Sequence, residues 1–230
     1  MRFQDAARDA RAVVYAGIQA DPLVARAAAL LADAGYEQRL LARAVMNGES
    51  TDGAAWRATF PSLFGPGSPL EPAELGRSEA ILAASLEVAG RGEQVRSQFR
   101  GAIVESLTAL LLGRRVGDAA VRRERRVLFD GVRAEIHPYD VTAELPGAAE
   151  AYDCKWGARG IGPDVLHQLD DARGHARDEE APLDVALVVF DARRSCDVRL
   201  AAQTAPTSGI GLITIETLDA LAGGPPATLP

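Results

Sequence analysis

The chain has 230 residues, of which 47% are hydrophobic, and a formal net charge of −7 at pH 7. It holds no stretch near the roughly 18 uninterrupted apolar residues of a membrane helix, no apolar signal-peptide region at its start, and no disulfide framework among its two cysteines. We therefore expect a globular, cytoplasmic protein with no membrane partner, large enough for one good core or two small ones.

The N-terminal part of the chain predicts helices. Three segments rich in Ala and Leu place apolar residues three or four apart, and each ends at or near Gly or Asn-Gly: residues 13–20, 22–35 and 36–48. Pro-containing turn signals across residues 60–76 predict a long connection before helix resumes at about Glu79. We expect residues 1–90 to form an all-helical domain that serves dimerisation, DNA recognition or docking of a partner protein.

Residues 91–223 are predicted to form a second domain, of the α/β class. Apolar side chains at helical spacing predict one long helix from Glu93 to Gly113. A polar helix after the third predicted strand implies that part of the sheet is parallel, and residues 224–230 are expected to be a mobile tail. Strands are predicted at 125–129, 133–145, 148–156, 184–190 and 211–218, and further helices at 163–177 and 195–202.

Basic residues are concentrated where this domain begins. Residues 91–133 hold ten arginines and five acidic residues, a local balance of +5 within an acidic chain. Such a segment supplies phosphate contacts to a nucleic acid or forms a solvated face of ion pairs, and the sequence leaves both open. For DNA contacts we single out Arg122 and Arg126, on the condition that they share a face of the first strand, and Arg159 in the loop after the third strand.

The only lysine, Lys155, lies in the stretch YDCKWG, whereas 24 arginines supply the other cationic side chains. Along a strand Asp153 and Lys155 point to one face, and Tyr152 and Cys154 point to the other. An ammonium can orient or deprotonate a water beside a metal ion, whereas the larger guanidinium keeps its proton. The pattern indicates ammonium chemistry; the alternatives are a structural ion pair with Asp153 and a chance lysine.

The turn signal Pro146-Gly147 separates the second and third strands. If it closes the hairpin symmetrically, Asp140 lies opposite Asp153 with Cβ atoms about 5 Å apart. Facing carboxylates repel each other unless a cation lies between them, and oxygen ligands without His or Cys favour Mg²⁺ or Mn²⁺. Because a trans Pro-Gly pair favours a type II turn, a register slip of one residue stays open.

Residues 92–218 resemble the PD-(D/E)XK nucleases, the restriction-endonuclease-like superfamily, in the manner of its resolvase and Mrr branches. The motifs that carry the resemblance are GAIVE at 101–105, HPYD at 137–140, DCK at 153–155, QL at 168–169 and GIGLITIETL at 209–218. Two departures stand out. Tyr139 separates the proline from the acid of the second strand, and Asp153 replaces the commoner Glu.

The resemblance implies a mixed central sheet flanked by helices, and a divalent-metal-dependent endonuclease that hydrolyses DNA. Because cleavage of both strands of a duplex suits two sites held together, we expect a homodimer. Its biological setting would be defence against foreign DNA, or DNA repair and recombination. The alternatives are RNA as substrate, and a catalytically inactive nuclease-fold module that binds DNA or a partner protein. The implied site comprises Asp140, Asp153 and the Cys154 carbonyl as ligands of Mg²⁺ or Mn²⁺, Lys155 as the catalytic lysine, Glu105 as a helix acid that contacts the metal, and Gln168 as the residue that orients a water or the substrate phosphate.

Overall fold

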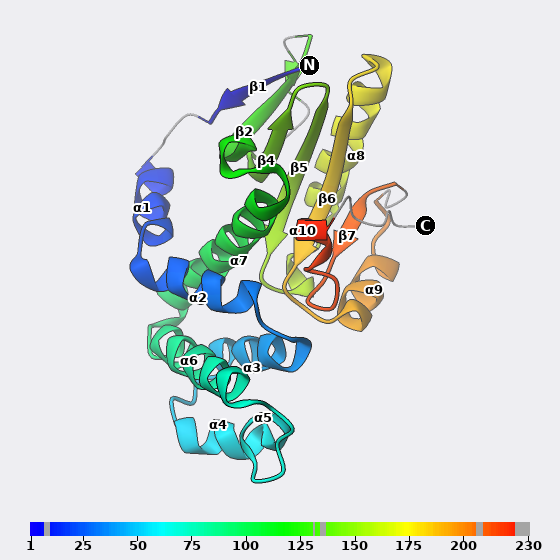
Figure 1. The fold of residues 1–230 in the computed structure, drawn as a ribbon. Helices are drawn as coiled ribbons and strands as arrows, with labels where there is room; N and C mark the ends of the chain where they lie inside the picture. The colour runs from blue at the N-terminus through cyan, green and yellow to red at the C-terminus, as the bar shows by residue number, and fades with distance from the viewer. Residues whose placement is uncertain (7–9, 131, 134–136, 206–208, 224–230) are drawn as a thin grey trace. The chain divides into compact units, whose positions relative to one another are not determined.

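Seven strands form one sheet in a computed structural model of the protein, which describes residues 1–6, 10–130, 132–133, 137–205 and 209–223 (Figure 1). Hydrogen-bonded neighbours follow the order β1-β2-β4-β5-β6-β7, and β3 pairs with β2 outside this row. The pairs from β1 to β5 are antiparallel, whereas β5-β6 and β6-β7 are parallel, so the predicted mixed α/β sheet is confirmed. The strands are β1 (Arg2–Asp5), β2 (Val121–Phe129), β3 (Val132–Arg133), β4 (Tyr139–Leu145), β5 (Ala148–Lys155), β6 (Leu183–Val189) and β7 (Gly211–Ile213).

The chain divides into two compact units. The sheet unit comprises Met1–Asp9 and Thr108–Pro230, and the helical unit comprises Ala10–Leu107. None of the described helices combines the length and apolar character that a bilayer-spanning segment requires. The helices are α1 (Ala10–Gln19), α2 (Pro22–Ala32), α3 (Tyr36–Asn47), α4 (Gly53–Thr59), α5 (Pro61–Phe64), α6 (Pro72–Ala89), α7 (Glu93–Val116), α8 (Pro163–Asp178), α9 (Arg193–Ala201) and α10 (Ala220–Gly223), with short 3₁₀ turns η1 (Asp118–Ala120) and η2 (Ala158–Gly160).

Helices cover both faces of the sheet within the sheet unit (Figure 1). On one face, Leu166 and Leu169 of α8 share a buried apolar cluster with Ala151 of β5. On the other face, the Thr108 hydroxyl in the C-terminal half of α7 lies 3.5 Å from the Cys154 sulfur. Because side chains alternate along a strand, odd-numbered residues of β5 face α8 and even-numbered residues face α7.

The core of the helical unit is built from the apolar faces of α2, α3 and α6. Val24, Leu41, Val45, Ile81 and Leu82 are each at most 1% exposed. Along α2 the buried residues Val24, Ala27 and Leu31 recur three or four apart, and along α3 Leu41 and Val45 are four apart, which is the period of one helix face. The sequence periodicity over residues 22–48 therefore predicted helices correctly.

The N-terminal ninety residues are not all helical, which corrects the prediction. Arg2–Asp5 form β1, which pairs with β2 across more than a hundred residues of sequence. Four residues are too few to show the alternation that marks a strand, so the pairing is set by the sheet rather than by local pattern. The division between the units also falls inside α7, at Leu107, rather than near residue 90.

Three further boundaries differ from prediction. The expected connection over 60–76 contains α5 and the start of α6, because Pro61 and Pro72 occupy first-turn positions where proline is compatible with helix. α7 continues past Gly113 to Val116, and β7 ends at Ile213 rather than at 218. The predicted mobile tail, residues 224–230, lies outside the described residues.

Candidate metal centre

The β4-β5 hairpin has the register that symmetric closure predicts. Its pairs run from Leu145 opposite Ala148 to Val141 opposite Tyr152, and one further step along the same register puts Asp140 opposite Asp153. The turn residue Gly147 has a φ of +77°, a conformation that glycine adopts without steric cost. The hairpin therefore closes with two turn residues, and the alternative of a one-residue slip is excluded.

Asp140 is fixed at the start of β4 by its own side chain. Its Oδ2 atom accepts a hydrogen bond of 2.6 Å from the backbone N–H of Cys154. The carboxylate thus replaces a backbone acceptor where the β4-β5 ladder ends. This bond places Asp140 beside the third-strand motif, next to Asp153 and Lys155.

Asp153 and Lys155 form an ion pair on the α8 face of β5. The Lys155 Nζ atom contacts Asp153 Oδ1, and the side chains are 26% and 7% exposed, respectively. The even-numbered neighbours Tyr152 and Cys154 point to the opposite face of β5. The Cys154 sulfur lies near Thr108 of α7, and the Tyr152 hydroxyl donates to Glu150. The predicted division of β5 into two faces is confirmed.

The charge state of Lys155 follows from its surroundings. Burial is the largest single influence on the pKa of Lys155 and lowers it, but the charges of Asp153 and Asp140 and the hydrogen bond to Asp153 together raise the pKa above its ordinary value. Lys155 is therefore held as an ammonium when only protein groups surround it. In this state it donates hydrogen bonds and does not accept a proton.

The donor set fits Mg²⁺ or Mn²⁺ bound jointly with a substrate. No cluster of three or more His, Cys, Asp or Glu side chains suited to a metal occurs among the residues that the structure describes. Mg²⁺ is commonly held by only one or two carboxylates, with waters and substrate phosphates as the other ligands. Buried Asp153 Oδ1 receives no hydrogen bond from described N–H or O–H groups beyond its ion pair with Lys155. Asp140, Asp153 and the Cys154 carbonyl are the candidate ligands.

Glu105, the predicted helix acid, belongs to the helical unit. It is 4% exposed, and both carboxylate oxygens accept hydrogen bonds from α1, at 2.5 Å from the Tyr15 hydroxyl and 2.7 Å from Gln19. Gly101 makes room for this contact, because a Cβ atom there would lie 3.0 Å from the Tyr15 hydroxyl. The structure thus shows how Glu105 is held, and its contact with a metal stays a prediction.

Gln168 holds the chain that enters β4. This side chain is 3% exposed on α8; its Oε1 accepts from the backbone N–H of His137 and its Nε2 donates to the His137 carbonyl, both at 3.1 Å. The amide therefore fixes the start of the HPYD motif, three residues before Asp140. Gln168 therefore has a structural function, and its predicted role in orienting a water or the substrate phosphate stays a prediction.

Replacing Gln168 by Leu is expected to lower the free energy of unfolding by about 1–3 kcal/mol, because it leaves the two backbone groups of His137 without these partners. Urea denaturation measures the change. Gln203→Leu is the matched control, since Gln203 donates one bond of 3.1 Å to the backbone carbonyl of Arg199 on partly exposed α9. Equal stability of Gln168→Leu and the wild type would show that the two hydrogen bonds between Gln168 and His137 contribute nothing to the free energy of unfolding.

The three arginines predicted to contact DNA are partly or fully exposed. Arg122 is exposed and donates to the backbone carbonyl of Val121 at 2.9 Å, Arg126 is half-buried, and Arg159 is exposed in η2. Between the first two, Glu124 has a φ of +52°, which interrupts regular strand alternation. The condition that Arg122 and Arg126 share a face by simple alternation is therefore not met. Their contacts with DNA stay predictions.

Asp191 is a buried acid that the sequence analysis missed. It is 6% exposed and lies two residues after the end of β6; its Oδ2 accepts from the backbone N–H of Ala158 at 3.0 Å and its Oδ1 accepts from that of Ala192 at 2.8 Å. Its signal in the sequence is its position just after the apolar run 184–190. The carboxyl ends of parallel strands are where functional side chains gather in open α/β sheets.

Alkaline pH is expected to destabilise the protein. Burial raises the pKa of the Cys196 thiol to about 12, burial and Glu150 raise the pKa of Tyr152, and Asp153 and Asp140 raise that of Lys155. Each group holds its proton more tightly folded than unfolded. The free energy of unfolding is therefore at its full value below about pH 8, and falls first through Cys196 and then, above about pH 10, through Tyr152 and Lys155.

Urea denaturation from about pH 8 to pH 11 measures this loss. Tyr152→Phe is expected to flatten the upper part of the curve, since phenylalanine does not titrate. A wild-type stability that is constant over this interval would contradict the assignment, as would an unchanged slope in Tyr152→Phe.

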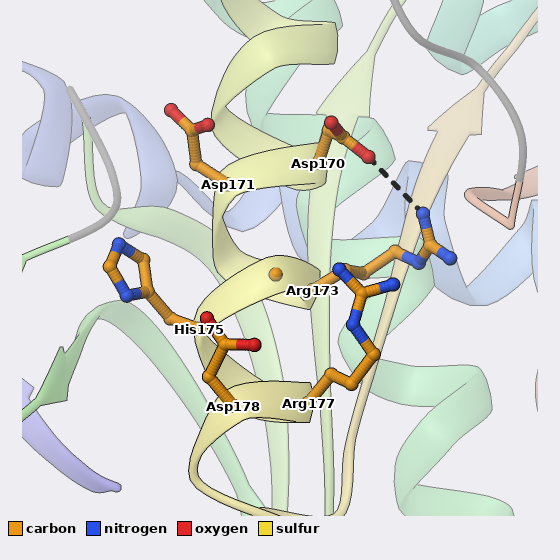
Figure 2. Close-up of a pocket in the computed structure, with 7 residues that line it drawn as sticks. Asp170, Asp171, Arg173, His175, Arg177 and Asp178 are labelled. Carbon is orange, nitrogen blue, oxygen red and sulfur yellow. Dashed lines mark hydrogen bonds and ion pairs between the residues drawn. The ribbon is translucent and has the colours of Figure 1, made fainter.

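A surface hollow of about 220 Å³ lies along α8 (Figure 2). Its described lining mixes acidic and basic side chains, and Arg173 pairs with Asp170 at 3.3 Å across it. None of the described lining residues belongs to the candidate metal centre. Its lining carries charges of both signs and is not combined with the candidate metal centre.

Comparison with known proteins leaves the function to be argued from these residues. No protein-family model and no curated protein matches the sequence. A solved structure described as protein VC1899 from Vibrio cholerae is similar, with a TM-score of 0.47 and 18% identity over 88% of this chain and 55% of that chain. The chain thus spans about half the length of that structure, and a likeness at this level carries no argument about function.

Proposed function

We propose that the protein is a divalent-metal-dependent endonuclease that hydrolyses phosphodiester bonds in DNA. One observation carries the proposal: the hairpin register opposes Asp140 and Asp153, and the only lysine of the chain is ion-paired with Asp153. Two carboxylates and one ammonium at the end of a strand combine metal ligands with a cationic hydrogen-bond donor. This is the chemistry that the resemblance to PD-(D/E)XK nucleases implies.

Each residue of the centre has a task in this reaction. Asp140, Asp153 and the Cys154 carbonyl hold Mg²⁺ or Mn²⁺, which when bound supplies charge to polarise the scissile phosphate and lowers the pKa of a water. Lys155 donates a hydrogen bond from its ammonium to the attacking water or to a phosphate oxygen, and so stabilises negative charge that develops there. In-line attack with departure of the 3′ oxygen yields a 5′ phosphate.

The surrounding elements support a nucleic-acid substrate. Exposed Arg122 and Arg159 supply positive charge for backbone contacts that carry no sequence preference, whereas half-buried Arg126 is not counted with Arg122 on one face. A homodimer would bring two centres to the two strands of a duplex. Restriction-like defence against foreign DNA is the setting that we favour, ahead of repair and recombination, and the helical unit offers a surface for a partner protein.

The proposal is tested with supercoiled plasmid, linear duplex, single-stranded DNA and RNA, each incubated with the wild-type protein in Mg²⁺, Mn²⁺ or EDTA. We expect DNA cleavage in either metal and none in EDTA. Direct appearance of linear plasmid would indicate paired cutting by a dimer, whereas nicked circles would indicate single active chains. DNA binding without cleavage in any metal would support an inactive module instead, and cleavage of RNA alone would overturn the substrate.

A further inference from the structure

The methylene chain of Lys155 is packed against the turn that follows its own strand. A Cβ atom added to Gly160 in η2 would lie 2.9 Å from Lys155 Cδ and 3.0 Å from both its Cβ and its Cγ. Real Cβ atoms essentially never show a separation of 2.9 Å, and separations of 3.0 Å are tighter than most, so the lysine occupies the space that any other residue at 160 would need. The close approach of the turn requires glycine at this position.

Buried Asp191 holds this turn to the sheet. Its Oδ2 accepts the Ala158 N–H at the first residue of η2, and its Oδ1 accepts the N–H of Ala192, so the carboxylate bridges the turn and the end of β6. The same strand end is bonded to β5 directly, because the Phe190 N–H donates to the Lys155 carbonyl at 2.8 Å. The backbone of Lys155 and the turn over its side chain are therefore anchored at one place.

A second bond fixes the far side of the turn. The Arg199 Nε atom of α9 donates to the Ile161 carbonyl at 2.8 Å, and the Gly160 N–H donates to the Gly157 carbonyl at 2.9 Å. Both ends of η2 are thus tied to elements other than β5. These hydrogen bonds hold the η2 turn in one position against the lysine side chain.

We propose that Asp191 and Gly160 are positioning residues that hold the Lys155 ammonium at the candidate metal centre through the η2 turn. The inference rests on the proposed function, since it assigns a task relative to the catalytic lysine. A lysine has four rotatable side-chain bonds, and catalysis requires its ammonium at one place. Asp191 acts through the turn, and Gly160 acts by letting the turn approach.

The single lysine of the chain allows a test that needs no activity. Protein grown with ¹³C,¹⁵N-lysine gives one set of lysine side-chain NMR signals, that of Lys155. These signals are recorded for the wild type, Gly160→Ala and Asp191→Asn. The matched controls are Gly162→Ala, where an added Cβ meets nothing within 4 Å, and Asp197→Asn on exposed α9, whose carboxylate pairs with Arg193.

We expect the ε-methylene signal of Lys155 to shift or broaden in Gly160→Ala and Asp191→Asn and to be unchanged in both controls. In cleavage assays the same two variants are expected to lose about 10- to 100-fold in kcat, as for a misplaced catalytic group, with KM changed by less than about threefold. Lys155 signals that superimpose on those of the wild type in both variants would overturn the inference.

The NMR measurement tests the positioning of Lys155 independently of the proposed nuclease activity. Signals that shift in a protein that cleaves nothing would sustain the positioning of Lys155 and reject the nuclease. Cleavage that is lost in Gly160→Ala while the lysine signals stay as in the wild type would reject the positioning alone. Asp191→Asn keeps the shape of the side chain, so it serves as the second variant where the added methyl of Gly160→Ala prevents folding.

Discussion

Lys155→Ala and Lys155→Arg are both expected to lower the rate of metal-dependent DNA cleavage by about 10²- to 10⁴-fold, the contribution of a positioned proton-transfer or hydrogen-bonding group. In Lys155→Ala the ammonium is missing. In Lys155→Arg the charge is kept, but a planar guanidinium is larger than an ammonium and presents its donors differently. The Gly160 turn lies against the Cβ, Cγ and Cδ atoms of the lysine, which arginine shares, so the two side chains differ only beyond Cδ, where the charged group is placed.

The control for these variants is Arg177→Lys on the exposed surface of α8, which exchanges the same two side chains outside the centre. It is expected to cleave like the wild type. Rates are measured by single-turnover plasmid cleavage in saturating Mg²⁺. Arginine at position 155 with near wild-type activity would show that the charge alone suffices, and alanine with near wild-type activity would remove Lys155 from the reaction.

Asp153→Ala is expected to lower the free energy of unfolding by about 3 kcal/mol in EDTA, because it removes the partner of a largely buried ammonium. Asp140 is left as the remaining nearby negative charge. The double variant Asp153→Ala, Lys155→Met also removes the ammonium that Asp153→Ala leaves without its ion-pair partner. We expect it to recover a large part of the free energy of unfolding that the single variant loses. The difference between the single and double variants isolates the ion pair.

Asp170→Ala is the matched control for this experiment. Asp170 also pairs with a basic residue, Arg173, but both side chains are about one-third exposed, at 37% and 30%. An exposed pair contributes about 0–1 kcal/mol. If Asp153→Ala costs no more than Asp170→Ala, or if the double variant is less stable than Asp153→Ala, the ion pair at the centre does not have the burial and coupling inferred from its geometry.

The arrangement of β4 and β5 was predictable because it depends on local rules. A Pro-Gly pair fixed the turn, the period of two assigned faces, and counting from the turn put Asp140 opposite Asp153. The parallel β5-β6 pair was predictable for a similar reason, since the intervening α8 makes a crossover. Resemblance to a nuclease family then suggested a role for each of these positions.

The contacts that hold the residues of the candidate metal centre in place were not predictable, because they join residues that are distant in sequence. Gln168 bonds to His137 from 31 residues away, and Asp191 reaches Ala158 across 33 residues. Neither contact leaves a period or motif in the sequence. Gly160 is a similar case, since a glycine in a loop usually marks chain flexibility, whereas here it marks the close approach of backbone to Lys155.

The most direct test of the account is Mn²⁺ binding in the absence of DNA, followed by electron paramagnetic resonance for the wild type and for Asp140→Asn, Asp153→Asn and the double variant. We predict one Mn²⁺ site per chain that weakens by about tenfold or more in each single variant and is lost in the double variant. Asp197→Asn should bind like the wild type. Unaltered binding in the double variant would contradict the claim that these two facing carboxylates form the metal centre.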